Sequence, residues 1–252
     1  MFVSDCVVGR VRVAFTDRHG GFSSGPWSSL NLAMPVTSST PASDAGDDPE
    51  AVSANLTRVA EAFGVKRADL RLMRQVHGRN VAVIDAQAAT PPTADALLTR
   101  TPGVVLLARA ADCVPVALAD TERGVAAVVH SGRVGTLAGV VPSAVEALRR
   151  HGAQTLTAWI GPRICGSCYE VPADLRAEVA AVEPATWSTT RSGSAALNLA
   201  AGVREQLRRA DVAVHDLADD GPVCTMESDD LFSYRRQGAR SGRLGVLVQV
   251  QP

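Results

Sequence analysis

Three side chains that commonly bind metal ions stand beside glycine or proline at the ends of apolar segments. His77 lies in Gln-Val-His-Gly, Cys113 in Ala-Asp-Cys-Val-Pro, and His130 in Val-His-Ser-Gly. Two imidazoles and one thiolate suit a zinc ion, and three protein ligands leave the fourth tetrahedral position open to water or substrate. Zinc in such a site lowers the pKa of its bound water to about 7 and so supplies hydroxide. The residue types therefore predict a catalytic zinc site.

The spacing of these residues leaves other interpretations open. The three positions are 36 and 17 residues apart, which matches no local ligand motif such as Cys-x-x-Cys or His-Glu-x-x-His. A single His at a strand end is often a hydrogen-bonded structural residue, and a Cys in an apolar run is often part of the core. Cys113 with a histidine could also act as nucleophile and base in a metal-free hydrolase.

The elements that must position these residues can be outlined from periodicity. Helices are predicted at 49–63, 137–150, 172–182 and 198–210. The first is the clearest, because Asp48 can cap it, Pro49 suits its first position and Gly64 can close it. Strands are predicted at 10–16, 70–76, 80–84, 104–109, 114–119, 124–130, 155–160, 212–217 and 243–250.

The order of the elements favours an α+β fold. Four or five strands follow one another between about residues 70 and 130 with no helix between them. This order is typical of mixed or packed β-sheets flanked by helices, whereas a doubly wound parallel sheet alternates strands with helices. Because there is no repeat or long linker, we expect a single domain over residues 1–252. The polar segment 37–48 is expected to form a loop before the first helix.

Composition narrows the class of protein. Apolar residues make up 46% and charged residues 20% of the chain, which is the balance of an ordinary globular protein. A net charge of -1 gives no reason to expect nucleic acid or an anionic membrane as a partner. The sequence has neither a run of ~20 apolar residues that would span a membrane nor the pattern of a signal peptide. We therefore expect a cytoplasmic monomer.

Other motifs carry less information. Cys165 and Cys168 form a Cys-Gly-Ser-Cys pair, but no second Cys-x-x-Cys is present to complete a zinc clasp. The pair follows a predicted loop, and we interpret it as two thiols without a shared role. No Walker or dinucleotide-binding fingerprint is present.

Taken in order, a larger set of motifs resembles one family. The motifs are Thr16–Ser23, Ser29–Leu32, Gln75–Gly78, Ala111–Cys113, His130–Gly132, Ile160–Pro162, Tyr169–Val171, Cys224–Thr225 and Phe232–Arg236. The sequence resembles the YfiH family, also called the laccase-domain or polyphenol-oxidase-like family. Its members include YlmD-type purine nucleoside phosphorylases and peptidoglycan editing factors.

The resemblance implies a mononuclear zinc site made of His77, Cys113 and His130. It also implies phosphorolysis of adenosine, inosine or methylthioadenosine, and deamination of adenosine, so that a purine nucleoside and phosphate are the small-molecule partners. Older members were called copper-dependent polyphenol oxidases. Copper is disfavoured here, because one Cys and two His do not supply the several copper sites of a laccase.

Five further residues are candidates for contact with substrate. Arg18 and Arg235 could bind phosphate, since phosphorolysis needs cationic donors. Asn31 and Gln75 could hold the ribose or the base, and Glu170 could move protons.

One motif departs from the family pattern. Members commonly read His-Ala-Gly-Trp-Arg-Gly after the second histidine, whereas this chain has Arg133 at the usual Trp position and Val134 at the usual Arg position. If the segment is extended, Arg133 points to the opposite face and does not replace that arginine. If the family's arginine binds phosphate, phosphorolysis is expected to be weak or absent in this chain.

Two alternatives remain for the function as a whole. The same zinc chemistry could serve an amidase that removes wrongly incorporated amino acids from peptidoglycan precursors. Alternatively, the chain could be a binding protein that kept the fold and lost activity, although all three predicted ligands are intact.

Overall fold

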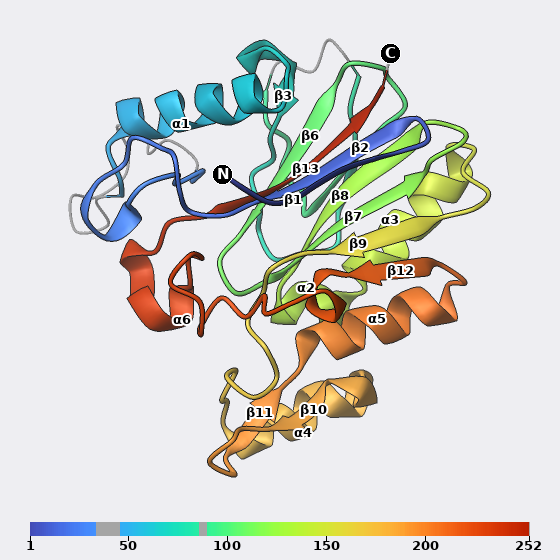
Figure 1. Ribbon diagram of the computed structural model, residues 1–252. Coiled ribbons are helices and arrows are strands. Elements are labelled where there is room, and N and C mark those ends of the chain that lie inside the picture. Colours follow the sequence, from blue (N-terminus) through green and yellow to red (C-terminus); the bar gives the residue numbers. More distant parts are fainter. Residues whose placement is uncertain (34–45, 86–89, 252) are drawn as a thin grey trace.

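Two mixed β-sheets pack face to face, and helices cover both outer faces (Figure 1). The computed structural model describes residues 1–33, 46–85 and 90–251. The five-stranded sheet has the spatial order β1 (Phe2–Val8), β2 (Val11–Thr16), β13 (Leu244–Val250), β6 (Val105–Ala110) and β3 (Leu70–Arg71). The six-stranded sheet has the order β12 (Ala213–Asp216), β9 (Thr157–Ile160), β7 (Val114–Asp120), β8 (Val125–Ser131), β5 (Ala96–Thr99) and β4 (Val81–Val83).

Six α-helices and a hairpin complete the described part of the chain. The helices are α1 (Pro49–Ala62), α2 (Arg133–Ala138), α3 (Val140–Arg150), α4 (Ala173–Val182), α5 (Leu199–Arg209) and α6 (Tyr234–Gln237). The hairpin joins β10 (Trp187–Thr189) to β11 (Ala195–Leu197) and lies beside α4, at the bottom of Figure 1. Short 3-10 turns are found at Gly25–Trp27, Arg67–Asp69, Pro184–Thr186, Leu217–Asp219 and Gly238–Arg240.

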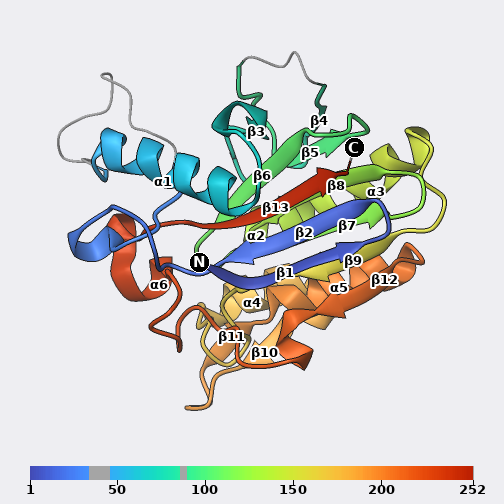
Figure 2. The ribbon, with the colours of Figure 1, turned by 45° about the horizontal axis from the view of Figure 1, so that its top comes forward.

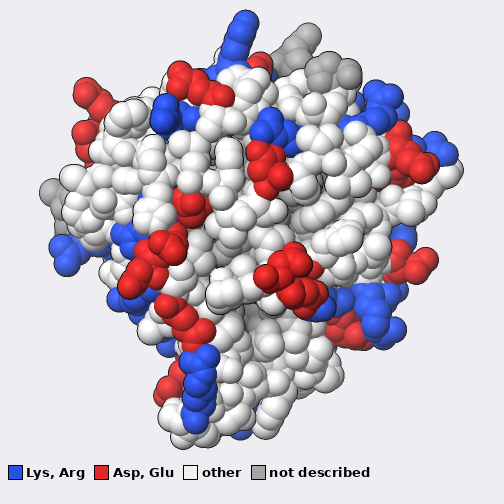
Figure 3. Space-filling model, in the orientation of Figure 1, with Lys and Arg blue, Asp and Glu red and all other residues white. Residues whose placement is uncertain are grey.

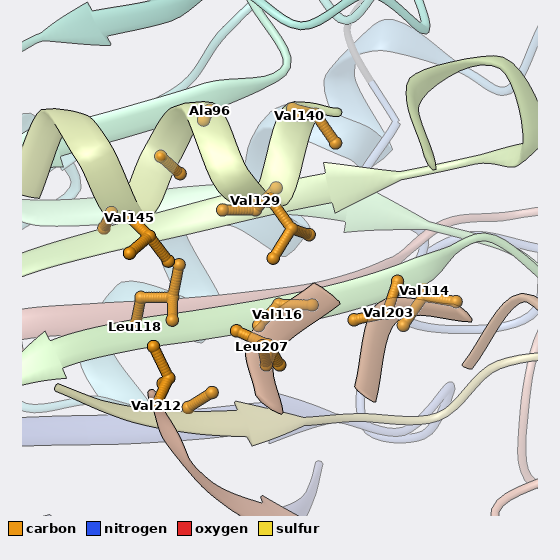
Figure 4. Packing of buried hydrophobic residues seen from close by; sticks show 14 of the residues in the cluster. Ala96, Val114, Val116, Leu118, Val129, Val140, Val145, Val203, Leu207 and Val212 are labelled. Carbon is orange, nitrogen blue, oxygen red and sulfur yellow. The ribbon is translucent and has the colours of Figure 1, made fainter. Parts of the chain in front are cut away.

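The two faces of each central strand pack into different apolar layers. In β7, Val116 and Leu118 face helices α3 and α5, whereas Ala117 and Ala119 face the five-stranded sheet. Figure 4 shows the helix-facing layer, with Val145 of α3 close to these strand residues. Because successive side chains alternate between faces, a strand buried on both faces reads as an uninterrupted apolar run.

A third apolar layer lies on the outer face of the five-stranded sheet. Leu56, Val59 and Phe63 of the α1 region pack there with Leu107 and Leu247 of the sheet. Turning the molecule as in Figure 2 shows α1 on this side of the sheets and α3 and α5 on the other. The order of layers is therefore helix, sheet, sheet, helices.

The predicted α+β fold, with packed sheets flanked by helices, is confirmed. All four predicted helices are present, with bounds that differ by no more than three residues. The start of α1 follows the expected chemistry: the Asp48 carboxylate accepts a hydrogen bond from the main-chain N–H of Glu50, and Pro49 occupies the first turn. Gly64 follows the helix with a φ of 72°. Most of the predicted loop 37–48 lies outside the described residues.

Several elements differ from the predictions. Strands β1 and β5, the β10–β11 hairpin and the short helix α2 were not predicted, and of the strand expected at 70–76 only Leu70–Arg71 is strand. The Gln75 side chain replaces part of the missing ladder, because its amide donates to the Arg109 carbonyl (2.7 Å) and accepts from the Arg109 N–H (3.0 Å).

The surface offers no broad region of one charge on the face shown in Figure 3. Lysine and arginine side chains are interspersed there with aspartate and glutamate. Within residues 1–33, 46–85 and 90–251, no helix is both long and apolar enough to cross a membrane.

Candidate metal centre and arginine-lined cavity

Two of the predicted ligands meet at one end of the six-stranded sheet because of strand register. The antiparallel pair β7–β8 aligns Val114 with Ser131 and Pro115 with His130. Cys113 directly precedes β7, and His130 lies at the end of β8. The sheet itself therefore brings a thiol and an imidazole to the same edge.

The third ligand is brought to this edge by a buried aspartate. Asp95 directly precedes β5, and its carboxylate accepts hydrogen bonds from the main-chain N–H groups of Val76 (3.2 Å), His77 (3.0 Å) and Gly78 (2.7 Å). The same carboxylate accepts from Nδ1 of His130 at 2.9 Å. A carboxylate only accepts, so the proton lies on Nδ1 and the Nε2 atom of His130 is left for a metal. Asp95 was not predicted as a site residue.

The three donor groups are close enough to hold one ion. Their donor atoms all lie within 4.8 Å of one another, and Cys113 Sγ is 4.0 Å from His77 Nε2. Tetrahedral zinc places such donors about 3.4–3.8 Å apart, so small side-chain shifts would close the set. The imidazoles of His77 and His130 meet edge to face with ring centroids 4.8 Å apart.

Gly132 leaves the space that this cluster needs. A Cβ atom at this position would lie 2.8 Å from His77 Cδ2 and 2.9 Å from Cys113 Sγ, well inside van der Waals contact. The glycine has φ −83° and ψ 179°, which any residue can adopt. It is therefore contact with the two donors, and not backbone conformation, that requires glycine here.

Protonation in the cluster follows from burial. Burial alone would raise the pKa of Asp95, but its hydrogen bonds from His130, Gly78 and Val76 lower it overall. Burial lowers the pKa of His130 despite the neighbouring carboxylate, so the ring is neutral at pH 7. Burial, with the charge of Asp112, raises the pKa of the Cys113 thiol to about 12. Both a thiol nucleophile and a zinc ligand need the thiolate, so Cys113 requires a nearby cation to lose its proton at pH 7.

The residue before Cys113 is held in an unusual conformation. Asp112 has a φ of 84°, in the left-handed region that few non-glycine residues adopt. Its carboxylate accepts hydrogen bonds from the Thr225 hydroxyl and from the main-chain N–H of Arg235, both at 2.6 Å. His77 also has a positive φ, 58°. Such strain persists where surrounding contacts enforce it, and it concentrates at functional sites.

The three donors open into a cavity of about 930 Å³, a volume typical of small-molecule sites. Five arginines line this cavity: Arg74, Arg109, Arg133, Arg235 and Arg243. None of the five forms a salt bridge with a carboxylate of the described residues. The cavity can therefore attract an anion beside the metal-binding donors.

One of these arginines, Arg109, is buried, and it lies near the partly buried Arg243. Burial and the charge of Arg243 lower the pKa of Arg109 to about 10, and burial lowers the pKa of Arg243. Arg109 donates through one terminal nitrogen to the Met73 carbonyl (2.6 Å), but its buried Nε has no partner among the described residues. A bound anion would screen the two charges from each other.

The candidate substrate residues fall into two groups. Asn31, Gln75 and Arg235 line the cavity. Arg18 does not: it donates to the Ser28 carbonyl at 2.7 Å and lies over the ring of Phe232. Glu170 is exposed to solvent and also lies outside the lining.

The two amide side chains in the lining are already hydrogen-bonded within the protein. Asn31 donates to Asp47 (3.0 Å) and accepts from the N–H groups of Ala33 and Arg243. Gln75 is bonded on both sides to the main chain of Arg109.

Arg133 lines the cavity, whereas in an extended segment its side chain would point to the face opposite that of residue 134. Residues 133–138 form helix α2, so the alternation of an extended chain does not apply. Arg133 lines the cavity, whereas Val134 is 48% exposed. Tyr169, which also lines the cavity, interacts with Arg133 and lies 5.1 Å from the guanidinium carbon of Arg235.

A pair of imidazoles and a thiol at a sheet edge, open to an arginine-lined cavity, defines an α+β protein with a candidate metal centre. The chain belongs to the family described as multi-copper polyphenol oxidoreductase laccase, whose model matches residues 12–251. The resemblance to YfiH and YlmD proteins is thereby confirmed.

The relatives cover almost the whole chain. A Streptomyces coelicolor protein named purine nucleoside phosphorylase is 49% identical over 238 residues, which cover 93% of each chain. The crystal structure of YlmD from Geobacillus stearothermophilus matches with a TM-score of 0.82 at 28% identity and covers 96% of this chain and 93% of that one. The crystal structure of Bacillus licheniformis YfiH has a TM-score of 0.81 at 25% identity, with the same coverage.

Proposed function

We propose that this protein is a zinc-dependent purine nucleoside phosphorylase that uses His77, Cys113 and His130 as zinc ligands. The observation that carries the proposal is the cavity. In it, the three potential metal-binding donors adjoin five arginines that form no salt bridge with any carboxylate in the described parts of the chain. Phosphorolysis needs an anion site beside the reacting nucleoside. This cavity has arginines that could bind phosphate and enough volume for a nucleoside beside them. The name of the Streptomyces coelicolor relative points to the same reaction.

The donor set fits zinc better than copper. Two imidazoles and one thiol within 4.8 Å of one another suit a tetrahedral ion with one open position. The chain contains five histidines, and of the described ones only His77 and His130 belong to such a donor group. Multi-copper oxidation needs further histidine-rich sites. When bound, zinc supplies Lewis-acid polarisation of a substrate oxygen or an activated water.

Phosphate is held by Arg133, Arg235 and the inner pair Arg109 and Arg243 in this proposal. Guanidinium groups bind phosphate through paired, charge-assisted hydrogen bonds. Tyr169 lies between Arg133 and Arg235 and keeps their side chains on the cavity wall. The arginine missing at position 134 is thus replaced from the neighbouring position on α2.

The proposed reaction exchanges one bond at the ribose for another, and the remaining candidate residues lie around or outside the space where this occurs. A phosphate oxygen forms a bond to C1′ of the ribose as the bond from C1′ to the purine nitrogen breaks, and the base leaves with the electron pair and takes up a proton. Asn31 and Gln75 shape the wall of the cavity, because their amides are engaged by Asp47 and Arg109. Arg18 and Glu170 lie outside the cavity lining and take no part in the proposed reaction.

Adenosine deamination is the second reaction we propose for this cavity, since the donors that hold zinc face the space that the substrate would occupy. The amidase alternative uses the same donors, and turnover of a UDP-muramyl-serine precursor with no turnover of nucleosides would favour it.

Arg133→Gln tests the phosphate site. Loss of one charge-assisted contact costs about 1.5–3 kcal/mol, so we expect KM for phosphate to rise roughly 10- to 100-fold while KM for the nucleoside changes little. Arg150→Gln, which removes an arginine paired with Glu146 on the surface of α3, is the matched control. An unchanged KM for phosphate in Arg133→Gln would exclude Arg133 from the phosphate site.

A further inference from the structure

A second group of metal-binding side chains lies outside the cavity, where two loops meet. Cys165 and Cys168 belong to the loop that follows β9, and Cys224 and Glu227 to the segment between β12 and α6. One donor atom from each of the four residues lies within 4.8 Å of the other three. A parallel bridge between Arg163 and Cys224 joins the two segments. The Cys-x-x-Cys pair thus has partners that are distant in sequence.

The two segments form turns of the same kind. The main-chain N–H of Cys168 donates to the Cys165 carbonyl (3.1 Å), and the N–H of Glu227 donates to the Cys224 carbonyl (3.2 Å). The turns face each other: the N–H of Cys165 donates to Cys224 Sγ (3.3 Å), and the Cys168 thiol donates to Glu227 Oε1 (3.3 Å). A Cys-x-x-Cys turn and a Cys-x-x-Glu turn therefore present four donors to one point.

We infer that Cys165, Cys168, Cys224 and Glu227 form a second metal site, a closed structural zinc site with three thiolates and one carboxylate. Four protein ligands are the mark of a structural zinc site, in contrast to the open position of a catalytic one. Tetrahedral Zn–S bonds place sulfurs about 3.8 Å apart, so the observed cluster needs only a small contraction. Binding would release three thiol protons and leave a site of net charge −2 next to Arg191, which already pairs with Glu227.

A metal site explains this cluster better than a redox pair does. A redox Cys-x-x-Cys motif needs only its two thiols, but here a third thiol and a carboxylate oxygen lie within 4.8 Å of the pair. A redox pair leaves the third thiol and the carboxylate without a role. Zinc, in contrast, uses all four donors and favours the thiolates directly.

The site would brace one wall of the cavity. Tyr169 follows Cys168 and lines the cavity, and Thr225 follows Cys224 and donates to the Asp112 carboxylate. Zinc between the two turns would therefore fix the position of Tyr169 and of the residue before Cys113. The inference does not rest on the proposed function, because it concerns a separate set of ligands.

Zinc content of the purified full-length chain tests the inference. Protein prepared with a phosphine reductant, loaded with zinc and passed over a desalting column, is analysed by plasma mass spectrometry. We expect about two zinc ions per chain, about one in Cys165→Ser/Cys168→Ser, and about one in Cys113→Ser. Cys6→Ser removes a partly buried thiol of β1 outside both clusters and is the matched control, with about two.

Cobalt substitution of the wild-type chain gives a second measurement that needs no variant. Co²⁺ in the second site should show strong thiolate charge-transfer absorption from three sulfurs, in addition to the weaker contribution of Cys113. Zinc content unaffected by Cys165→Ser/Cys168→Ser, together with a one-thiolate cobalt spectrum, would overturn the inference. A disulfide would overturn it as well. Protein prepared without reductant, then denatured in the presence of a chelator, should give five free thiols on titration. Three free thiols would mean that two of the cysteines form a disulfide.

Discussion

Gly132→Ala separates the geometry of the metal centre from the stability of the fold. The added methyl group would lie 2.8 Å from His77 Cδ2 and 2.9 Å from Cys113 Sγ, whereas comfortable contact requires about 3.5–4.0 Å. One or both donors must therefore move by about 0.6–1 Å. Zinc sites tolerate deviations of only about 0.2 Å in ligand distance, so the donor set no longer closes around the ion.

The expected loss of zinc affinity depends on which atoms near the added methyl group can move. The main chain at His77 is fixed by the Asp95 carboxylate, so the imidazole must rotate away from its position. We expect zinc affinity to fall roughly 10- to 100-fold, the range seen when the partners of metal ligands are removed. This corresponds to about 1.4–2.8 kcal/mol. Activity at limiting zinc should fall in parallel.

The metal-free protein should respond differently. Gly132 has an extended conformation that alanine adopts without strain, and the donor side chains can rotate freely when no ion holds them. We expect the unfolding temperature of metal-free Gly132→Ala to stay within a few degrees of that of the wild-type protein. The part of the zinc-induced increase that comes from binding at His77, Cys113 and His130 should be largely lost.

Competition with a chromophoric zinc chelator, together with thermal unfolding with and without zinc, measures both quantities. Gly221→Ala is the matched control, since its Cβ would meet nothing within 4 Å. Wild-type zinc affinity in Gly132→Ala would refute the placement of the ion between His77, Cys113 and His130.

Two further perturbations test the supports of the site and of the fold. Asp95→Asn should lower zinc affinity about 10- to 100-fold in the same chelator assay. The reason is that the carboxylate that accepts from His130 Nδ1 and from three main-chain N–H groups loses its charge. Unchanged zinc affinity would show that Asp95 does not support the metal centre. Asp120→Asn should destabilise the fold by about 2–3 kcal/mol at pH 7, since the buried carboxylate accepts from four main-chain N–H groups. These hydrogen bonds outweigh burial and lower the pKa of Asp120, so its contribution is present above the unfolded-state pKa of about 3.9 and is lost as pH falls through the lower folded pKa. Denaturant unfolding should therefore give a lower free energy of unfolding for Asp120→Asn than for the wild-type protein at pH 7, and this difference should shrink below pH 4. A difference that does not change with pH would contradict the argument.

A site residue could be predicted where its side-chain type indicates its role, but not where its role depends on contacts with the main chain. The grouping of His77, Cys113 and His130 could be predicted, because residue types that bind metals stand at strand ends and match motifs of a family. Asp95 could not, because it acts on main-chain N–H groups whose positions no residue type reveals.

The remaining differences have local or long-range causes. The position of Arg133 could not be predicted from the alternation of an extended segment, because this residue begins helix α2. Strand β1 was missed because partly buried positions alternate with exposed ones along an edge strand, which leaves no apolar run. The Cys165 and Cys168 pair was interpreted as isolated because its partners, Cys224 and Glu227, come from a distant loop.

Product analysis after incubation with adenosine tests the central claim most directly. Zinc-loaded protein is incubated with and without phosphate, and the products are separated by chromatography and identified by mass. Adenine together with ribose 1-phosphate, formed only when phosphate is present, is the predicted result. Inosine alone would mean deamination without a working phosphate site, and no turnover of any nucleoside would contradict the account and leave the muramyl-peptide amidase as the hypothesis to test.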